Sequence, residues 1–247
     1  MRPLPPGARR PRAAVAIVLA AALALLAGVA LAMRGADEPP QVGLFTSLPI
    51  LWNETPDIAA MLRPQHTPHW ARAVLGRHGE IVALDTLESM DGFDRLVLAQ
   101  PRPLGPAENL ALDRWVRAGG KLLLLADPAL TEPSAYALGD RRRPQDIVML
   151  SPILTRWGLA LEFDDEQPPI ERRPEIMGVA VPVVLPGNLR PVGPNCRLWG
   201  DGVAASCGIG KGRVIVLADA SVLERADPDD ARANAFDWLL TSAFTAR

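Results

Sequence analysis

The amino-acid sequence predicts an α/β domain with a mostly parallel sheet and helices on both faces, preceded by one N-terminal transmembrane helix. Two features of the 247-residue chain lead to this fold class: an unbroken apolar run over residues 13–33, and short apolar strands that alternate with helical segments farther along. Continuous apolar strands are typical of sheets buried on both faces, and their alternation with helices indicates parallel pairing.

The apolar run over residues 13–33 is long enough to cross the hydrocarbon core of a bilayer as a helix. Arginines precede it at positions 2, 9, 10 and 12, so the N-terminus is expected in the cytoplasm. We therefore expect a single-pass inner-membrane protein with the membrane itself as one partner. Its segments are a cytoplasmic basic tail over 1–12, an anchor over 13–33, a linker over 34–41 and a periplasmic α/β domain over 42–247.

A cleaved secretory signal stays open as an alternative to the anchor. The triplet Ala30-Leu31-Ala32 fits a small-x-small cleavage site, although the apolar run is longer than the usual core of a signal peptide. Both interpretations place the remaining residues across the membrane.

Strands are expected where short apolar runs lie between turn residues. These runs cover residues 42–45, 81–85, 95–100, 121–127, 159–164 and 212–219. The proline-rich residues 165–195 contain short β-like pieces, which are expected as edge strands or as an excursion from the main sheet.

Helices are expected between the strands, over residues 69–77, 106–118, 146–158 and 229–243. The second of them is the best defined, because Pro106 stands at its start and Gly119-Gly120 follows its end. Pro152 must interrupt or kink the third helix, since proline lacks the backbone N–H of a helix interior.

Cys196 and Cys207 flank a predicted hairpin. A two-residue turn at Asp201-Gly202 would place the two cysteines opposite each other, so they are candidates for a disulfide. The same two-residue turn assigns them to a hydrogen-bonded pair, in which the Cα atoms lie farther apart than a disulfide favours. A catalytic role for either thiol has little support, because no histidine is near them in the sequence.

Two segments together resemble a known group of proteins. They are DRWVRAGGKLLLLADP, from Asp113 to Pro128, and GKGRVIVLADASVL followed by ANAFDWLL near the C-terminus. In this order they resemble the GldG-like auxiliary proteins of ABC transporters and the related DUF4350 proteins, which have a class I glutamine-amidotransferase-like domain. The resemblance implies a flavodoxin-like sheet and an accessory role. Glutaminase chemistry does not carry over, because both cysteines lie in the late hairpin rather than on a strand-to-helix turn.

Polar residues follow several of the predicted strands, and in a parallel sheet ligands bind outside the carboxyl ends of the strands. We expect a polar rim there that could hold the hydroxyl groups of a ligand or a cation. An alternative is that the aspartates only brace the turns after their strands. The rim candidates are Thr46, Ser47, Asp85, Gln100, Asp127 and Asp219.

The loop after the first strand is unusually apolar. It carries Leu48, Ile50, Leu51 and Trp52 among polar residues. These side chains are candidates for a protein-partner surface, because exposed apolar patches often mark interaction sites. The alternative is that the loop folds over the edge of the sheet as part of the core.

Other motifs are weaker. His66 and His69 lack a third zinc ligand nearby, and the glycines around Lys211 precede a strand instead of leading from a strand into a helix. Arg141-Arg142-Arg143 could dock an anionic partner, but acidic neighbours favour a solvated loop. The sequence therefore predicts no catalytic residue, no cofactor and no bound metal.

The function expected from these features is a membrane-anchored, non-catalytic periplasmic accessory or binding domain, with a protein partner in an ABC-type transport or envelope complex. The alternative is a metal-assisted hydrolase that uses the carboxylates of the rim. The formal charge of −2 argues against a nucleic-acid partner, which normally requires a basic face.

Overall fold

The computed structural model describes residues 40–55, 68–224 and 230–245. The chain divides into two compact units, Met1–Pro40 and Gln41–Arg247. All of the helices and strands below belong to the second unit.

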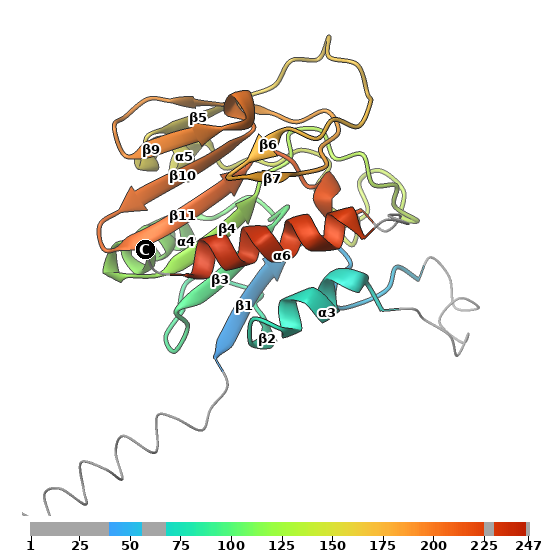
Figure 1. Cartoon of the computed structure of the whole chain (residues 1–247). Helices are drawn as coiled ribbons and strands as arrows, with labels where there is room; N and C mark the ends of the chain where they lie inside the picture. Colours follow the sequence, from blue (N-terminus) through green and yellow to red (C-terminus); the bar gives the residue numbers. More distant parts are fainter. Residues whose placement is uncertain (1–39, 56–67, 225–229, 246–247) are drawn as a thin grey trace, which may run out of the picture. The chain divides into compact units, whose positions relative to one another are not determined.

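A seven-stranded sheet forms the centre of this unit, in the order β2-β1-β3-β4-β11-β10-β9 (Figure 1). The first five strands of that order run parallel, whereas β10 and β9 are antiparallel to their neighbours. The strands are β1 (Gln41–Thr46), β2 (Glu80–Ala83), β3 (Arg95–Ala99), β4 (Lys121–Leu125), β9 (Cys196–Trp199), β10 (Ala204–Ile209) and β11 (Gly212–Leu217).

Helices cover both faces of the sheet. In Figure 1, α3 (Trp70–Gly76) and α6 (Ala231–Phe244) lie in front of the sheet, while α4 (Pro106–Ala118) and α5 (Ser151–Trp157) lie behind it. Successive leucines of β4 point to opposite faces and join two separate core clusters, so the strand is buried on both sides.

Proline residues determine where two of the helices begin. Pro106 occupies the first turn of α4, whose end is marked by Gly119 with φ 132°. The helix predicted over 146–158 begins only at Ser151, because Pro152 fits the first turn of a helix but not its interior. The first five residues of that prediction are therefore wrong.

The strand predicted over 159–164 does not join the main sheet. It forms β5 (Leu159–Glu162), which pairs with β8 (Asn188–Pro191) as a separate two-stranded sheet. A second small sheet joins β6 (Glu175–Ile176) to β7 (Val179–Ala180). Two short 3₁₀ helices, η1 (Gly200–Gly202) and η2 (Ser221–Leu223), complete the elements.

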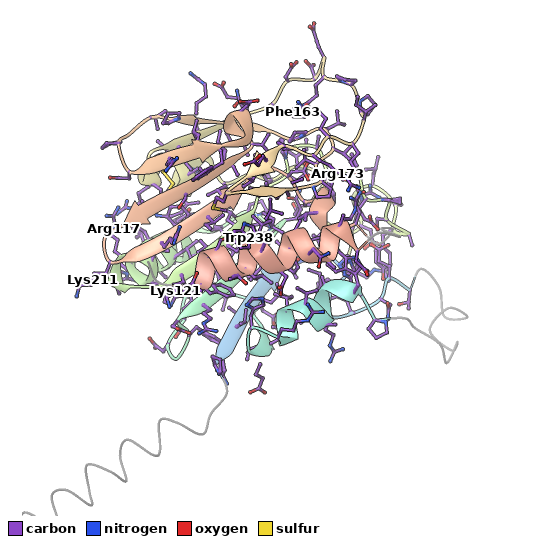
Figure 2. The ribbon with its side chains drawn as sticks, viewed as in Figure 1. Arg117, Lys121, Phe163, Arg173, Lys211 and Trp238 are labelled. Atoms are coloured by element: carbon purple, nitrogen blue, oxygen red, sulfur yellow. A yellow bond between two sulfur atoms is a disulfide. The ribbon has the colours of Figure 1, made fainter. Side chains whose placement is uncertain are left out.

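The turn between β10 and β11 explains one glycine of the motif around Lys211. Gly210 has φ 63°, and a Cβ added to it would lie 2.8 Å from the Cα of Arg117. Only glycine fits this position without strain. Arg117 accepts a backbone hydrogen bond from Lys211 there, at the end of the sheet where Figure 2 labels both side chains.

The fold class predicted from the sequence, an amidotransferase-like flavodoxin-type sheet with a preceding transmembrane helix, is wrong on two counts. The first is that the sheet is not a wholly parallel flavodoxin-like one: beyond β11 it continues antiparallel through β10 and β9, the strands of the cysteine hairpin. The second error is the transmembrane helix expected before the sheet.

Within residues 40–55, 68–224 and 230–245, none of the helices has the length and apolar character needed to cross a membrane. The predicted anchor over residues 13–33 lies outside the described residues. None of the described helices supports the membrane as a partner or the single-pass inner-membrane location with a periplasmic domain, and both expectations are withdrawn.

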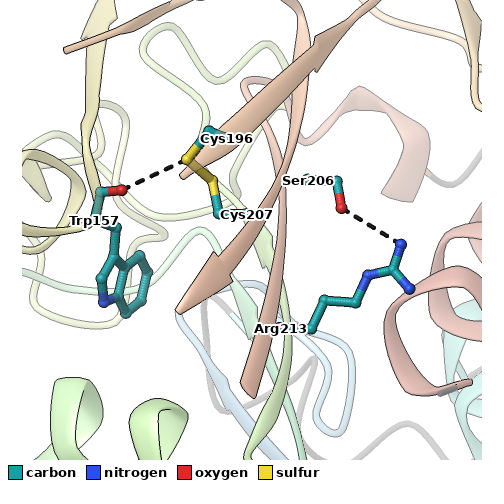
Figure 3. The surroundings of a disulfide bond; sticks show 5 residues. All are labelled: Trp157, Cys196, Ser206, Cys207 and Arg213. Atoms are coloured by element: carbon teal, nitrogen blue, oxygen red, sulfur yellow. Dashed lines mark hydrogen bonds between the residues drawn. A yellow bond between two sulfur atoms is a disulfide. The ribbon is translucent and has the colours of Figure 1, made fainter. Parts of the chain in front are cut away.

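The structure joins Cys196 and Cys207 by a disulfide, shown in Figure 3. Their Cα atoms are only 4.1 Å apart. Gly208 donates a backbone hydrogen bond to Asn195, so the adjacent cysteines form a non-hydrogen-bonded pair, in which the strands approach more closely. The expected hydrogen-bonded pairing is wrong because the loop that joins the strands contains four residues, 200–203, instead of two.

Candidate functional site

A cleft of about 700 Å³ lies at the carboxyl ends of the first parallel strands. The order β2-β1-β3-β4 makes the carboxyl ends of β1 and β3 a reversal point, because the connection after β1 leads to β2 on one side and the connection after β3 leads to β4 on the other. Such a reversal point is where open α/β sheets bind ligands. The cleft is lined by Phe45, Thr46, Ser47, Trp52, Asn53, Thr55, Leu84, Asp85, Arg102, Tyr136, Arg141, Arg142, Arg143 and Gln145.

The hydroxyl groups at the end of β1 hold the cleft together. Thr46 donates to the carbonyl of Ala99 at 2.7 Å, and Ser47 donates to the carbonyl of Gln100 at 2.5 Å. The backbone N–H of Gln145 donates to the Ser47 hydroxyl at 3.0 Å. These bonds fix the loop after β1 against β3 and against the long loop after β4.

Arg102 connects the strand ends on the other side of the cleft. Its guanidinium makes two 2.8 Å bonds to the Glu108 carboxylate and donates to the carbonyl of Asp85 at 2.8 Å. It also lies over the Phe45 ring, 4.9 Å from the centroid. The hydrogen bond from Arg102 is the main reason that the pKa of Glu108 falls to about 2, so the positive charge of Arg102 is offset by a carboxylate.

Two of the three consecutive arginines are also paired. Arg142 bonds Asp140 at 2.7 Å and covers the Tyr136 ring, while Arg143 bonds Asp146 at 2.8 Å. Arg141 is exposed and has no carboxylate partner among the described residues.

The six predicted rim residues divide into two groups. Thr46, Ser47 and Asp85 line the cleft, and Asp85 is its only lining carboxylate. Gln100, Asp127 and Asp219 are fully buried and line none of the cavities described here.

The side-chain amide of Gln100 braces the start of the loop after β4. Its oxygen accepts from the backbone N–H of Asp127 at 2.9 Å, and its nitrogen donates to the carbonyls of Asp127 and Gln145. Gln100 has φ 45°, a left-handed conformation that is uncommon for residues other than glycine. These three bonds hold it there.

The two buried aspartates accept hydrogen bonds from the backbone. Asp127 accepts from Ala129 at 2.8 Å and from Ala220 at 3.1 Å. Asp219 accepts from Ser221 at 2.6 Å and from Val184 at 3.0 Å. The carboxylates therefore join the turns after β4 and β11 to each other and to the segment before β8.

Burial raises the pKa of Asp127 to about 6, and burial together with the charge of Asp127 raises the pKa of Asp219. A raised pKa in the folded state means that folding takes up protons between about pH 4 and pH 6, so stability increases as the pH falls through that range. Lowering the pH from about 7.5 to about 5 should raise the free energy of unfolding by about 1 kcal/mol, measured by urea denaturation.

The matched control for this pH dependence is His78→Gln, which removes another partly buried polar pair, the 2.9 Å contact between His78 and Asp237, and leaves both buried aspartates in place. The variant should keep the increase in stability. A wild-type protein whose stability falls over this pH range would contradict the assignment to the buried aspartates.

The apolar residues of the loop after β1 also fall into two groups, one buried and one exposed. Leu48 and Ile50 are buried in the core, and Leu51 packs against it. Trp52 is 42% exposed and lines the cleft. Of the four predicted partner-surface residues, Trp52 alone has a large side chain that is exposed.

The histidine motif does not form a metal site in the described part of the chain. His66 lies outside it, and His69 caps α3 by accepting from the backbone N–H of Ala71 at 3.1 Å. Within the described residues, His, Cys, Asp and Glu side chains form no group of three or more that could hold a metal ion.

Sequence reasoning missed Arg102 and Tyr136, which the fold brings into the cleft. Arg102 follows β3 and stands six residues before its partner Glu108, at the start of a predicted helix. That proximity to a strand end was the available signal. No sequence signal pointed to Tyr136, because its position depends on the path of the loop after β4.

No family model matches the chain, and no curated protein matches it. The resemblance to GldG-like and DUF4350 proteins therefore stays a prediction.

Among solved structures, the chain is similar to an exo-β-1,4-mannosidase from Opitutaceae bacterium strain TAV5, with 14% identity, a TM-score of 0.53, and coverage of 87% of this chain and 37% of that chain. A β-galactosidase from the haloarchaeon Halorubrum lacusprofundi matches with 17% identity and a TM-score of 0.47, covering 84% and 31%. A cytoplasmic protein from Salmonella typhimurium matches with 12% identity and a TM-score of 0.48, covering 84% and 99%.

The chain spans about a third of the length of the two glycosidases. The mannosidase likeness bears on the fold alone. With a glycosidase as structural neighbour and no membrane-spanning helix among the described residues, the predicted amidotransferase-like class is corrected. The predicted role as a membrane-anchored, non-catalytic accessory domain of a transport complex was an expectation tied to that class, and it is withdrawn with it.

Proposed function

We propose that the protein acts on carbohydrate, and that the cleft at the carboxyl ends of β1 and β2 binds a neutral saccharide of one or two sugar units. The observation that carries this proposal is the combination of an exposed tryptophan, Trp52, with unpaired hydrogen-bonding groups in one cleft of about 700 Å³. That volume lies within the range of small-molecule sites.

Trp52 supplies the apolar surface of the proposed site. Sugar rings have a face of C–H groups, which packs against the flat face of an aromatic ring, and tryptophan offers a large surface at low entropic cost. Tyr136 is less suited to this role, because Arg142 covers its ring at 4.2 Å.

Asp85, Asn53 and Arg141 supply the polar contacts. They line the cleft near Trp52, and their side chains make no hydrogen bond to another described residue. A carboxylate accepts hydrogen bonds from sugar hydroxyls, a guanidinium donates hydrogen bonds to them, and an amide can do both.

The charge of the cleft favours a neutral ligand over an anionic one. Three of its four arginines, Arg102, Arg142 and Arg143, are offset by carboxylate partners. The remaining charges, on Asp85 and Arg141, are opposite in sign. The activity of the structural neighbour, a mannosidase, supports a saccharide as the neutral ligand.

Titration calorimetry of the full-length chain with mannose, β-1,4-mannobiose and lactose tests the proposal. We expect saturable binding of at least one of these sugars, and Trp52→Ala should weaken it by roughly tenfold or more, because a central aromatic contact dominates small binding sites. Trp238→Ala is the matched control: Trp238 is 38% exposed, close to the 42% of Trp52, but it lies outside the cleft. Absence of binding, or equal losses in both variants, would refute the proposal.

Hydrolysis of the bound saccharide is the second candidate function, favoured by the position of Asp85 in the cleft and by the glycosidase neighbour. Glycosidases normally use two carboxylates, and Asp85 is the one that lines this cleft, so binding has the stronger geometric support. Release of nitrophenol from a nitrophenyl β-mannoside, lost in Asp85→Asn, would establish hydrolysis. The metal-assisted form has no three-ligand group among the described residues.

A further inference from the structure

A second cavity, of about 270 Å³, lies against the face of the sheet at β9, β10 and β11, and shares no lining residue with the cleft. Its other wall comes from α6, where Figure 2 labels Trp238, and from the turn between β6 and β7. It is lined by Met177, Arg197, Trp199, Ser206, Arg213, Trp238, Thr241, Ser242 and Thr245.

Strand register explains why two arginines meet in this cavity. Arg197 of β9 lies opposite Ser206 of β10, which in turn lies opposite Ile215 of β11. Arg213 is two residues from Ile215 and therefore projects from the same face of the sheet. The Arg213 guanidinium donates to the Ser206 hydroxyl at 3.4 Å. Figure 3 draws this hydrogen bond as a dashed line.

Neither arginine has a carboxylate partner within the described part of the chain. Arg197 stacks on the Trp199 ring at 4.2 Å, and the one hydrogen bond of the Arg213 side chain within the described residues goes to Ser206. The lining residues include no Asp or Glu. The cavity therefore holds two positive charges without compensation, in contrast to the paired arginines of the cleft.

The remaining lining groups add hydrogen-bond donors. Thr241, Ser242 and Thr245 bring hydroxyl groups, and the buried indole N–H of Trp199 has no acceptor among the described residues. The carbonyl end of α6 works against an anion here, but it amounts to about half a negative charge, against two full positive ones.

We propose that this cavity binds a small tetrahedral oxyanion, phosphate or sulfate, either free or as a group on a small organic ligand. Guanidinium groups form paired, charge-assisted hydrogen bonds with such oxyanions, and two of them approaching from β9 and β11, on either side of β10, enclose the anion from two sides. The modest volume excludes a large ligand. This site is independent of the saccharide cleft and does not rest on the function proposed for it.

Calorimetric titration of the full-length chain with inorganic phosphate and with sulfate, at constant ionic strength set by chloride, tests the proposal. Saturable binding of at least one anion is expected. Arg197→Gln and Arg213→Gln should each weaken it by roughly tenfold or more, because each removes a charged hydrogen-bonding partner. Free oxyanion and a carried group are distinguished by comparing inorganic phosphate with a sugar phosphate.

Arg114→Gln is the matched control, since Arg114 is exposed on α4, on the opposite face of the sheet. It should bind the anion as the wild type does, and so should the cleft variant Trp52→Ala. Thermal unfolding of each variant checks that it is folded, and Ser206→Ala offers a milder change in the same cavity. No saturable binding by the wild type, or equal losses in the arginine variants and in Arg114→Gln, would overturn the proposal.

Discussion

Replacing Glu108 by alanine is expected to lower the free energy of unfolding by roughly 2 kcal/mol or more, because two backbone N–H groups and the Arg102 guanidinium then lose their acceptor. Glu108 is 5% exposed and accepts hydrogen bonds from the backbone N–H groups of Gly105 at 2.9 Å and Leu87 at 3.1 Å. It also binds Arg102 through both carboxylate oxygens. One side chain therefore caps α4, fixes the loop after β2 and neutralises the arginine beside the cleft.

Urea denaturation of Glu108→Ala measures this loss, with Glu88→Ala as the control, because Glu88 is exposed in the same loop. The control should change stability by less than about 0.5 kcal/mol, as surface substitutions usually do. Similar losses in the two variants would contradict the role given to Glu108.

The contribution of Glu108 to stability should also depend on pH. Its pKa falls from 4.5 to about 2 in the folded protein, mainly because of the Arg102 hydrogen bond. A lowered pKa contributes stability that is present above the unfolded value and is lost as the pH falls toward the folded one. The stability difference between the wild type and Glu108→Ala should therefore shrink as the pH drops from about 5 to about 2.

Removing the disulfide is the second change that we expect to have a large effect on stability. Replacing Cys196 and Cys207 together by serine should lower the free energy of unfolding by about 3 kcal/mol, the value expected for a closed loop of this size. Their sequence separation is 11 residues, and the bond holds β9, the edge strand of the sheet, against β10. Cys207 is also buried in the core, so serine adds a cost of its own.

Thermal unfolding with and without a reducing agent separates these two contributions. Reduction should destabilise the wild type and leave the double-serine variant unchanged. A wild type that is insensitive to reduction, under conditions in which both thiols are shown to be free, would contradict a stabilising role for the bond.

Sequence patterns located the parallel strands well. The runs predicted at 42–45, 81–85, 95–100, 121–127 and 212–219 overlap β1, β2, β3, β4 and β11, because strands buried on both faces must be continuously apolar. The same pattern at 159–164 gave no warning that β5 would pair with β8 outside the main sheet. The choice of partner strand depends on distant residues, which local periodicity does not contain.

The site was predictable only in part, for the same reason. Thr46, Ser47 and Asp85 were found because they follow strands, and the carboxyl ends of parallel strands meet. That rule does not distinguish an exposed carboxylate such as Asp85 from one that is buried in a turn, such as Asp127. The difference arises from how the loop after β4 folds over the sheet.

The most direct test of the proposed saccharide site is a crystal structure of the full-length protein with β-1,4-mannobiose, or with whichever sugar binds most tightly in solution. A sugar ring should lie against Trp52, with its hydroxyl groups bonded to Asp85 and Arg141. An empty cleft at saturating sugar, or a sugar bound elsewhere on the protein, would contradict the proposal.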